Sequence, residues 1–357
     1  MKTIVVLGMH RSGTSAITRA LGLLGAEMGP ASHMGHTWEN KPLRNVNARL
    51  LDAGKGAWDT PPLADDWLDT VPAEGLVDVA RERFEAEFGG ADIAVWKDPR
   101  TCLTFPFWAP VLGESDTVIV LIYRHPFEVA RSLETRNKAR HGGSFALWER
   151  YNREALRFAA GRPTTVIGYG DILEDPQAVM AGLAANLRAW GVDLPNDPAT
   201  TDMELQQSER HHVSDTAVTD LDVATESQRA IFEALRSLDG PHDSFVPPEL
   251  PAANPLSLEI LDVLNKIRRL RKRAESVDTT AGANRRPRNA RNAGASAKSG
   301  SAGGSGSAGS ADRTSSSTSS TRGAAKTASK TAARTAKTAA RSGEKTRSAR
   351  RASTPTS

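Results

Sequence analysis

The first residues of the chain contain a strand, a glycine-bounded turn and the start of a helix, and few fold classes begin in this order. Thr3–Leu7 is a short, β-branched apolar run of the kind that forms a strand buried on both faces. Gly8 and Gly13 bound the turn that follows, and Ser15–Leu24 has the apolar spacing of a helix. A strand that feeds a helix in this way is typical of a parallel sheet covered by helices.

The same alternation of strands and helices continues along the chain. Further buried strands are predicted at Asp92–Trp96, Thr117–Tyr123 and Thr164–Tyr169. Helices are predicted at Leu43–Leu51, Gly75–Phe88, Pro126–Arg136, Phe145–Ala160, Pro176–Trp190 and Glu226–Leu238. We therefore expect residues 1–250 to form an α/β domain of three layers with a mostly parallel sheet.

The C-terminal part of the chain has a different pattern. Prolines near residue 250 mark a boundary, and from Leu256 to Val277 apolar residues recur at alternating spacings of four and three. This heptad pattern predicts a short coiled-coil-like helix over 255–277 that self-associates weakly. Residues 278–357 contain no aromatic residue and consist mainly of Ala, Ser, Gly, Thr, Lys and Arg, so we expect a disordered tail.

Charge divides the chain at about the same place. Residues 276–357 contain 16 Lys and Arg but only 3 Asp and Glu, whereas residues 1–275 contain 30 and 39. The sequence pI of about 9.3 therefore comes from the tail and not from the predicted domain. Such a tail is expected to attract a polyanion, namely nucleic acid, an anionic membrane surface or an acidic glycan. A solvated tail with no partner is the alternative.

The turn Gly8–Ser15 has the composition of an anion-binding loop. Its glycines let backbone N–H groups point toward an oxyanion, and the helix that follows adds the positive end of its dipole. The spacing is close to the Walker A motif, so we expect a P-loop-like domain, but Thr14 stands where that motif has its lysine. The cation of the loop is Arg11 instead. The loop therefore predicts an anion site and disfavours ATP or GTP as the ligand.

Two segments together resemble a known enzyme family. Val6–Ser15 looks like the 5′-phosphosulfate loop of sulfotransferases that use PAPS (3′-phosphoadenosine 5′-phosphosulfate), in the Arg-Ser-Gly-Thr form of many bacterial members. Tyr123–Ser132 is similar to the segment of that family that binds the 3′-phosphate. The resemblance covers roughly residues 2–215 and implies PAPS as co-substrate, with no metal required. It assigns the 5′-phosphosulfate to Arg11, Ser12, Gly13, Thr14 and Ser15, and the 3′-phosphate to Arg124 and Ser132.

Sulfuryl transfer also needs a general base that takes the proton of the acceptor. Some sulfotransferases use a glutamate in the crossover after the first helix, which makes Glu39 the candidate in this chain. A carboxylate that merely stabilises the start of a helix is the other interpretation of Glu39. The alternative bases are His10, His33, His36 and Asp59.

Three further basic residues are candidates for the same site. Lys97 and Arg100 follow the second strand, and ligands collect at the carboxyl ends of parallel strands. A structural ion pair with Asp98 is the alternative role for both. Arg210 is a candidate contact to the nucleotide, whereas His211 and His212 are interpreted as loop residues and not as a zinc pair.

These patterns predict a sulfotransferase that moves a sulfuryl group from PAPS to a hydroxyl or amine. The acceptor stays open among carbohydrates, lipids, peptides and small molecules. The alternatives are a P-loop nucleotide kinase or nucleotidase, and a polyanion-binding protein that acts through its tail. Cys102 is the only cysteine, and no apolar run reaches the roughly 20 residues of a membrane span or the core of a signal peptide. We therefore expect a cytoplasmic protein.

Overall fold

The computed structural model describes residues 1–72, 74–113, 116–139, 141–201 and 224–283. Met1–Arg288 belongs to one compact unit. Arg210, His211, His212 and the predicted tail from residue 284 onward lie outside the described residues.

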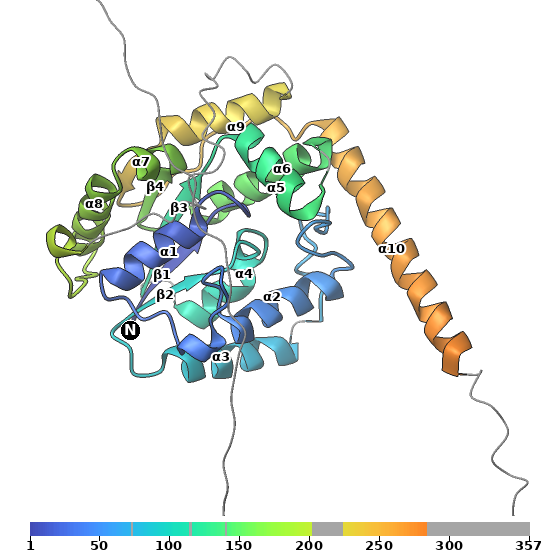
Figure 1. Cartoon of the computed structure of the whole chain (residues 1–357), viewed down its shortest axis with the longest axis horizontal. Helices are drawn as coiled ribbons and strands as arrows, with labels where there is room; N and C mark the ends of the chain where they lie inside the picture. Colours follow the sequence, from blue (N-terminus) through green and yellow to red (C-terminus); the bar gives the residue numbers. More distant parts are fainter. Residues whose placement is uncertain (73, 114–115, 140, 202–223, 284–357) are drawn as a thin grey trace, which may run out of the picture. The chain divides into compact units, whose positions relative to one another are not determined.

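A five-stranded sheet in the order β2-β1-β3-β4-β5 forms the centre of this unit (Figure 1). The strands are β1 (Lys2–Leu7), β2 (Ile93–Lys97), β3 (Thr117–Tyr123), β4 (Thr164–Gly168) and β5 (Gly240–His242). The first four run parallel, and β5 joins the edge of β4 in antiparallel orientation. The prediction of an α/β fold with a mostly parallel sheet is confirmed.

Helices cover both faces of the sheet, because successive residues of a strand point to opposite faces. The helices are α1 (Thr14–Leu23), α2 (Lys41–Ala53), α3 (Glu74–Phe88), α4 (Thr101–Leu112), α5 (Pro126–Asn137), α6 (His141–Phe158), α7 (Tyr169–Glu174), α8 (Pro176–Ala189), α9 (Glu226–Ser237) and α10 (Pro255–Ala283). Ile4 and Val6 pack in one core with α1, α7 and α8. Val5 and Leu7 pack in the other core with α2 to α6 and α9. The fold therefore has three layers.

Two helices of the domain have no counterpart in the sequence prediction. α4 contains Pro106 and Pro110, which argue against a helix, yet it lies in the larger core with Phe105 and Trp108 buried. Tertiary packing outweighs the local preference in this segment. α7 begins at Tyr169, so the preceding strand ends at Gly168, one residue earlier than predicted.

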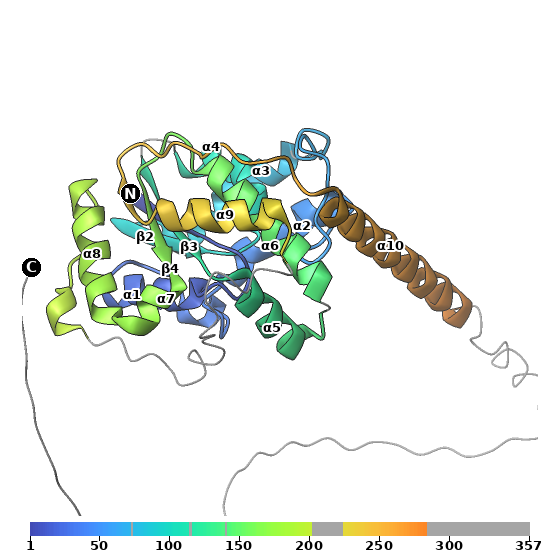
Figure 2. The same ribbon diagram turned by 90° about the horizontal axis from the view of Figure 1, so that it is seen from above.

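α10 is longer than the predicted helix and belongs to the same compact unit as the sheet. It continues beyond the expected end at Val277 to Ala283. Leu261 is buried in the larger core, and α10 packs along α6 (Figure 2). None of the helices within the described ranges is long and apolar enough to cross a bilayer.

Candidate active site

The glycine loop leaves β1 at the carboxyl end of the sheet, between β2 and β3. A Cβ atom at Gly8 would lie 2.5 Å from the carbonyl oxygen of Ile122, so the first position of the loop accepts only glycine. Gly13 has a φ of 94°, and a Cβ there would lie 2.1 Å from the ring of Tyr169. Both glycines are therefore required by close approach, which explains the sequence of the turn.

The loop presents an open helix N-terminus. Gly13 is the N-cap of α1 and has no side chain that could bond to the first-turn N–H groups, and the first turn contains no acidic residue. Arg11 has a φ of 71° and is exposed, whereas Ser12 is fully buried and is not among the residues that line the adjoining cavity. The structure thus turns the Arg11 side chain, and not that of Ser12, toward solvent. Such a helix N-terminus favours an anion.

A cavity of about 530 Å³ adjoins the loop. Its lining comes from the loop and α1, from the crossover before α2, from β2 and from the β3–α5 and α7 segments. The lining residues are His10, Arg11, Gly13, Thr14, Ser15, Ala16, His36, Thr37, Glu39, Lys97, Pro99, Arg124, Ser132, Thr135, Arg136 and Tyr169. Most of the predicted site residues therefore meet in one cavity.

The two predicted nucleotide-binding segments touch one another. Arg11 Nε donates a hydrogen bond of 2.7 Å to Ser132 Oγ, although 121 positions separate the two residues. Arg124 Nη1 donates to the carbonyl oxygen of Arg11 at 3.3 Å. The guanidinium of Arg124 also lies 4.5 Å from the centre of the Tyr169 ring and pairs with Glu128 at 2.6 Å.

Positive charge dominates the lining of this cavity. Arg11, Lys97, Arg124 and Arg136 contribute four cationic groups, whereas Glu39 is the one carboxylate among the lining residues that the structure describes. Burial lowers the pKa of Arg11, and Arg136 and Arg124 lower it further. Close cations repel one another, so a bound anion with several charges relieves this repulsion.

Lys97 lies buried where β2 ends and connects the loop to the crossover. Its ammonium donates to Ser15 Oγ at 3.3 Å and to the carbonyl oxygen of Thr37, and it lies 3.5 Å from the Glu39 carboxylate. Burial lowers the pKa of Lys97 to about 8, although Glu39 and Asp98 oppose this shift. Lys97 is therefore a cation that can lose its proton in mildly alkaline solution.

Arg100 takes part in a local network behind the cavity. Its guanidinium lies 2.8 Å from Asp98 and 3.7 Å from Glu39, and it is not among the lining residues. Asp98 also accepts a hydrogen bond of 2.9 Å from Asn47. The contact with Asp98 is the structural ion pair considered from the sequence, and Arg100 lies behind Glu39 as seen from the cavity lining.

The alternative bases differ in their access to the cavity. His10 lines it, and its Nε2 atom is buried without a hydrogen-bond partner among the described residues. Burial lowers the pKa of His10 well below its usual value, and Arg100 and Lys97 add to this effect. His36 is exposed and also lines the cavity. His33 instead bonds to Glu87 at 2.8 Å.

Asp59, the remaining alternative, is exposed and is not among the residues that line the cavity. Its carboxylate therefore has no place in the cavity described here. Within the described ranges, no group of three or more His, Cys, Asp or Glu side chains is arranged to hold a metal ion.

Tyr169, Thr135 and Arg136 line the cavity but were not predicted from the sequence. Arg136 lies four residues after Ser132 on α5, and residues with this spacing share one face of a helix, so the signal for it was present. Tyr169 gave no such signal, because the apolar run of β4 leads directly into it.

The chain matches no protein-family model and no curated protein sequence. Two solved structures are similar to it. The sulfotransferase domain of the Synechococcus PCC 7002 olefin synthase is 17% identical, with 74% of this chain and 94% of that domain covered and a TM-score of 0.32. The sulfotransferase domain of the curacin biosynthetic pathway is 14% identical, with 74% and 97% covered and a TM-score of 0.34.

Proposed function

We propose that this chain is a sulfotransferase that uses PAPS as its sulfuryl donor. The observation that carries the proposal is the contact between the two predicted nucleotide segments. Arg11 of the loop and Ser132 of α5 bond at 2.7 Å, and both line one cationic cavity. A nucleotide with a 5′-phosphosulfate and a separate 3′-phosphate carries negative charge at both of its ends, and the cationic groups of this cavity are spread in the same way.

The proposed binding mode divides the cavity by the order of the strands. Because β1 lies between β2 and β3, the loop separates the Lys97 side from the Arg124 side. The 5′-phosphosulfate binds at the loop and the N-terminus of α1, where Arg11, Thr14 and Ser15 donate hydrogen bonds. Arg124 and Ser132 bind the 3′-phosphate, and Arg136 adds charge at the same end.

The reaction is an in-line transfer of the sulfuryl group. The acceptor oxygen or nitrogen forms a bond to sulfur, and the bond between sulfur and the bridging phosphate oxygen breaks. Negative charge develops on that phosphate oxygen, so Arg11, Ser15 and the loop N–H groups lower the barrier by binding it more strongly in the transition state. The products are the sulfated acceptor and PAP (3′-phosphoadenosine 5′-phosphate).

We assign the acceptor proton to the carboxylate of Glu39. Glu39 lines the cavity on the Lys97 side, next to the loop that holds the transferred group. Its distances of 3.5 Å to Lys97 and 3.7 Å to Arg100 leave it able to accept a hydrogen bond from an incoming hydroxyl or amine. His10 is the alternative, because its Nε2 atom borders the same cavity.

The proposal is tested by measuring which ligand group Arg124 recognises. Arg124→Ala removes a charge-assisted contact worth about 1.5–3 kcal/mol, so PAP affinity should fall about tenfold or more. Affinity for adenosine 5′-phosphosulfate, which lacks the 3′-phosphate, should barely change. Arg131→Ala on the exposed side of α5 is the matched control and should change neither affinity. Equal losses for both ligands in Arg124→Ala would contradict the proposed binding mode.

A further inference from the structure

Exposed apolar side chains concentrate on one helix of this domain. Seven large apolar side chains are exposed in the part of the chain that the structure describes, and five of them belong to α10. The five are Leu256, Leu258, Val263, Ile267 and Leu270. Single exposed apolar residues are ordinary on a protein surface, but a cluster of this kind marks a contact surface.

Four of these side chains form a stripe along α10. Leu256, Val263, Ile267 and Leu270 follow spacings of seven, four and three residues, which places them on one face of a helix. We call these four residues the apolar stripe. Their exposed fractions are 57%, 46%, 39% and 63%.

The opposite face of α10 packs against the domain. Ser257, Leu261 and Asn265 are buried, and Asn265 donates a hydrogen bond of 2.9 Å to the carbonyl oxygen of Pro61. Farther along the helix, Arg268 bonds to Asp52 of α2 at 2.9 Å, and Lys272 bonds to the same carboxylate. The domain therefore fixes the rotation of α10 about its axis, and this rotation leaves the apolar stripe in solvent.

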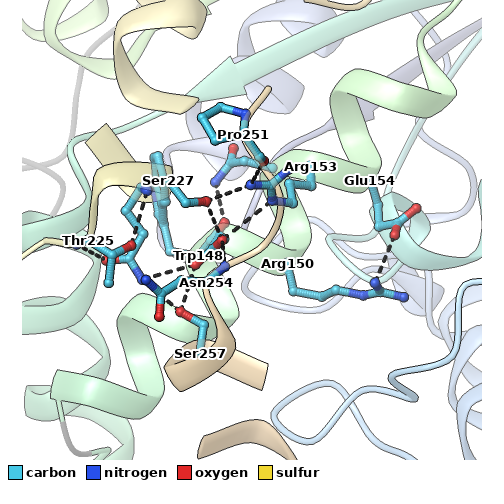
Figure 3. Close-up of polar contacts among 12 residues, drawn as sticks. Trp148, Arg150, Arg153, Glu154, Thr225, Ser227, Pro251, Asn254 and Ser257 are labelled. Carbon is cyan, nitrogen blue, oxygen red and sulfur yellow. Dashed lines mark hydrogen bonds and ion pairs between the residues drawn. The ribbon is translucent and has the colours of Figure 1, made fainter. Parts of the chain in front are cut away.

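A buried carboxylate fixes the first turn of α10. Glu149 of α6 is 2% exposed and accepts hydrogen bonds from Ser257 Oγ at 2.7 Å and from the Asn254 N–H at 3.1 Å. Ser227 Oγ of α9 donates to it at 2.5 Å, and Arg153 Nε lies 3.4 Å away. Figure 3 shows Ser227, Asn254 and Ser257 converging from α9, the connecting segment and α10. The start of the stripe is therefore held in place by a fully hydrogen-bonded ion.

The charges beside the stripe favour a particular partner. In a pair of helices that uses the stripe as its seam, Glu259, Lys266 and Arg273 lie along one edge. When two copies pair antiparallel about Lys266, Glu259 of each copy lies opposite Arg273 of the other. In a parallel pair, Lys266 of one copy would instead meet Arg271 of the other and repel it. The sequence of α10 is therefore complementary to its own antiparallel copy.

The centre of this arrangement brings two Lys266 side chains together. Each Lys266 ammonium lies 2.6 Å from Asp262 of its own helix. This contact offsets the charge where the two copies cross, so the central lysines do not oppose the pairing.

We propose that the apolar stripe of α10 pairs antiparallel with the stripe of a second copy of this chain. The seam extends over only about three heptads, so the association is weak and depends on concentration. The buried Glu149 cluster holds α10 in the position that exposes the stripe. The pairing joins two copies through a surface separate from the nucleotide cavity.

The first test is the mass of the full-length chain in solution. Sedimentation over about 5–500 μM should show an average mass that rises from 38.2 kDa toward twice that value. Ile267→Glu combined with Leu270→Glu should remain monomeric over the whole range. Val246→Glu alters an exposed apolar side chain outside α10 and should still associate. A monomeric wild-type chain, or a stripe variant that associates as well as wild type, would overturn the proposal.

The second test separates antiparallel pairing from other forms of association. Glu259→Lys alone and Arg273→Glu alone should each weaken the dimer about threefold or more, because each places like charges opposite one another. The double variant exchanges the two charges and should regain most of the wild-type affinity. A double variant that is weaker than both single variants would overturn the antiparallel arrangement, whether or not the chain dimerises.

Discussion

Glu39 and Glu149 are both buried carboxylates, yet their surroundings differ. Glu149 accepts hydrogen bonds from serine, amide and backbone donors at 2.5–3.2 Å, so its lone pairs are used within the protein. Glu39 faces the Lys97 ammonium at 3.5 Å and the Arg100 guanidinium at 3.7 Å, and it borders a cavity. A saturated carboxylate stabilises the fold, whereas one that keeps hydrogen-bonding capacity beside a cavity is available for chemistry.

The difference between the two glutamates predicts opposite consequences for the same substitution. Glu39→Gln keeps the shape of the side chain but removes the base, so turnover should fall by about 10²–10⁴. PAP affinity, measured by calorimetry, should stay within about threefold of wild type. Turnover close to wild type would exclude Glu39 as the base, and a large loss in His10→Gln would then assign that role to His10.

Replacement of Glu149 should act on stability and leave the cavity unchanged. Glu149→Ala leaves Ser227, Ser257 and Arg153 without their acceptor, and the free energy of unfolding should fall by about 3–5 kcal/mol. Urea unfolding measures this change. PAP affinity of the folded variant should match wild type, and a selective loss of PAP affinity without a loss of stability would show that the two regions are not separate.

A third consequence concerns pH. Burial lowers the pKa of Lys97 to about 8, so this side chain is charged at pH 7 and becomes neutral as the pH rises through that value. An anion binds the charged form more tightly, so PAP affinity should fall above pH 8 by at most about tenfold per pH unit. Lys97→Met should bind more weakly at pH 7 and show little change from pH 7 to 9. An unchanged pH dependence in this variant would assign the titration to another group.

The smallest expected effect concerns His10. If Glu39 takes the acceptor proton, His10→Gln should lower turnover less than about tenfold, because burial keeps His10 neutral and leaves it only a supporting hydrogen bond. Steady-state kinetics measures this change. A loss as large as that in Glu39→Gln would remove the distinction between the two side chains.

The sequence predicted the parts of the fold that depend on local pattern. Buried strands such as β1 and β3 are continuous apolar runs, and α9 begins with a capping Thr225, so these elements follow from neighbouring residues. α4 does not, because its two prolines oppose a helix and only burial against the core favours one. Local propensity is a weak guide where tertiary packing decides.

The site was predictable to the extent that it lies in two contiguous segments. The resemblance of Val6–Ser15 and Tyr123–Ser132 to a known family indicated the loop and the α5 residues, and the structure places most of them around one cavity. The Glu149 cluster joins residues that are 78 to 108 positions apart, and no local pattern indicates such contacts. Tyr169 reaches the cavity only because β4 lies next to β3.

The most direct measurement of the central claim is calorimetry of the full-length chain with PAP, ATP and GTP, each with and without Mg²⁺. Thr14 replaces the lysine that a nucleoside triphosphatase uses for its terminal phosphates, whereas Arg124 and Ser132 are placed for a 3′-phosphate. PAP should therefore bind at least about tenfold more tightly than ATP or GTP, with no dependence on Mg²⁺. Binding of ATP as tight as that of PAP, and strengthened by Mg²⁺, would contradict the assignment as a sulfotransferase.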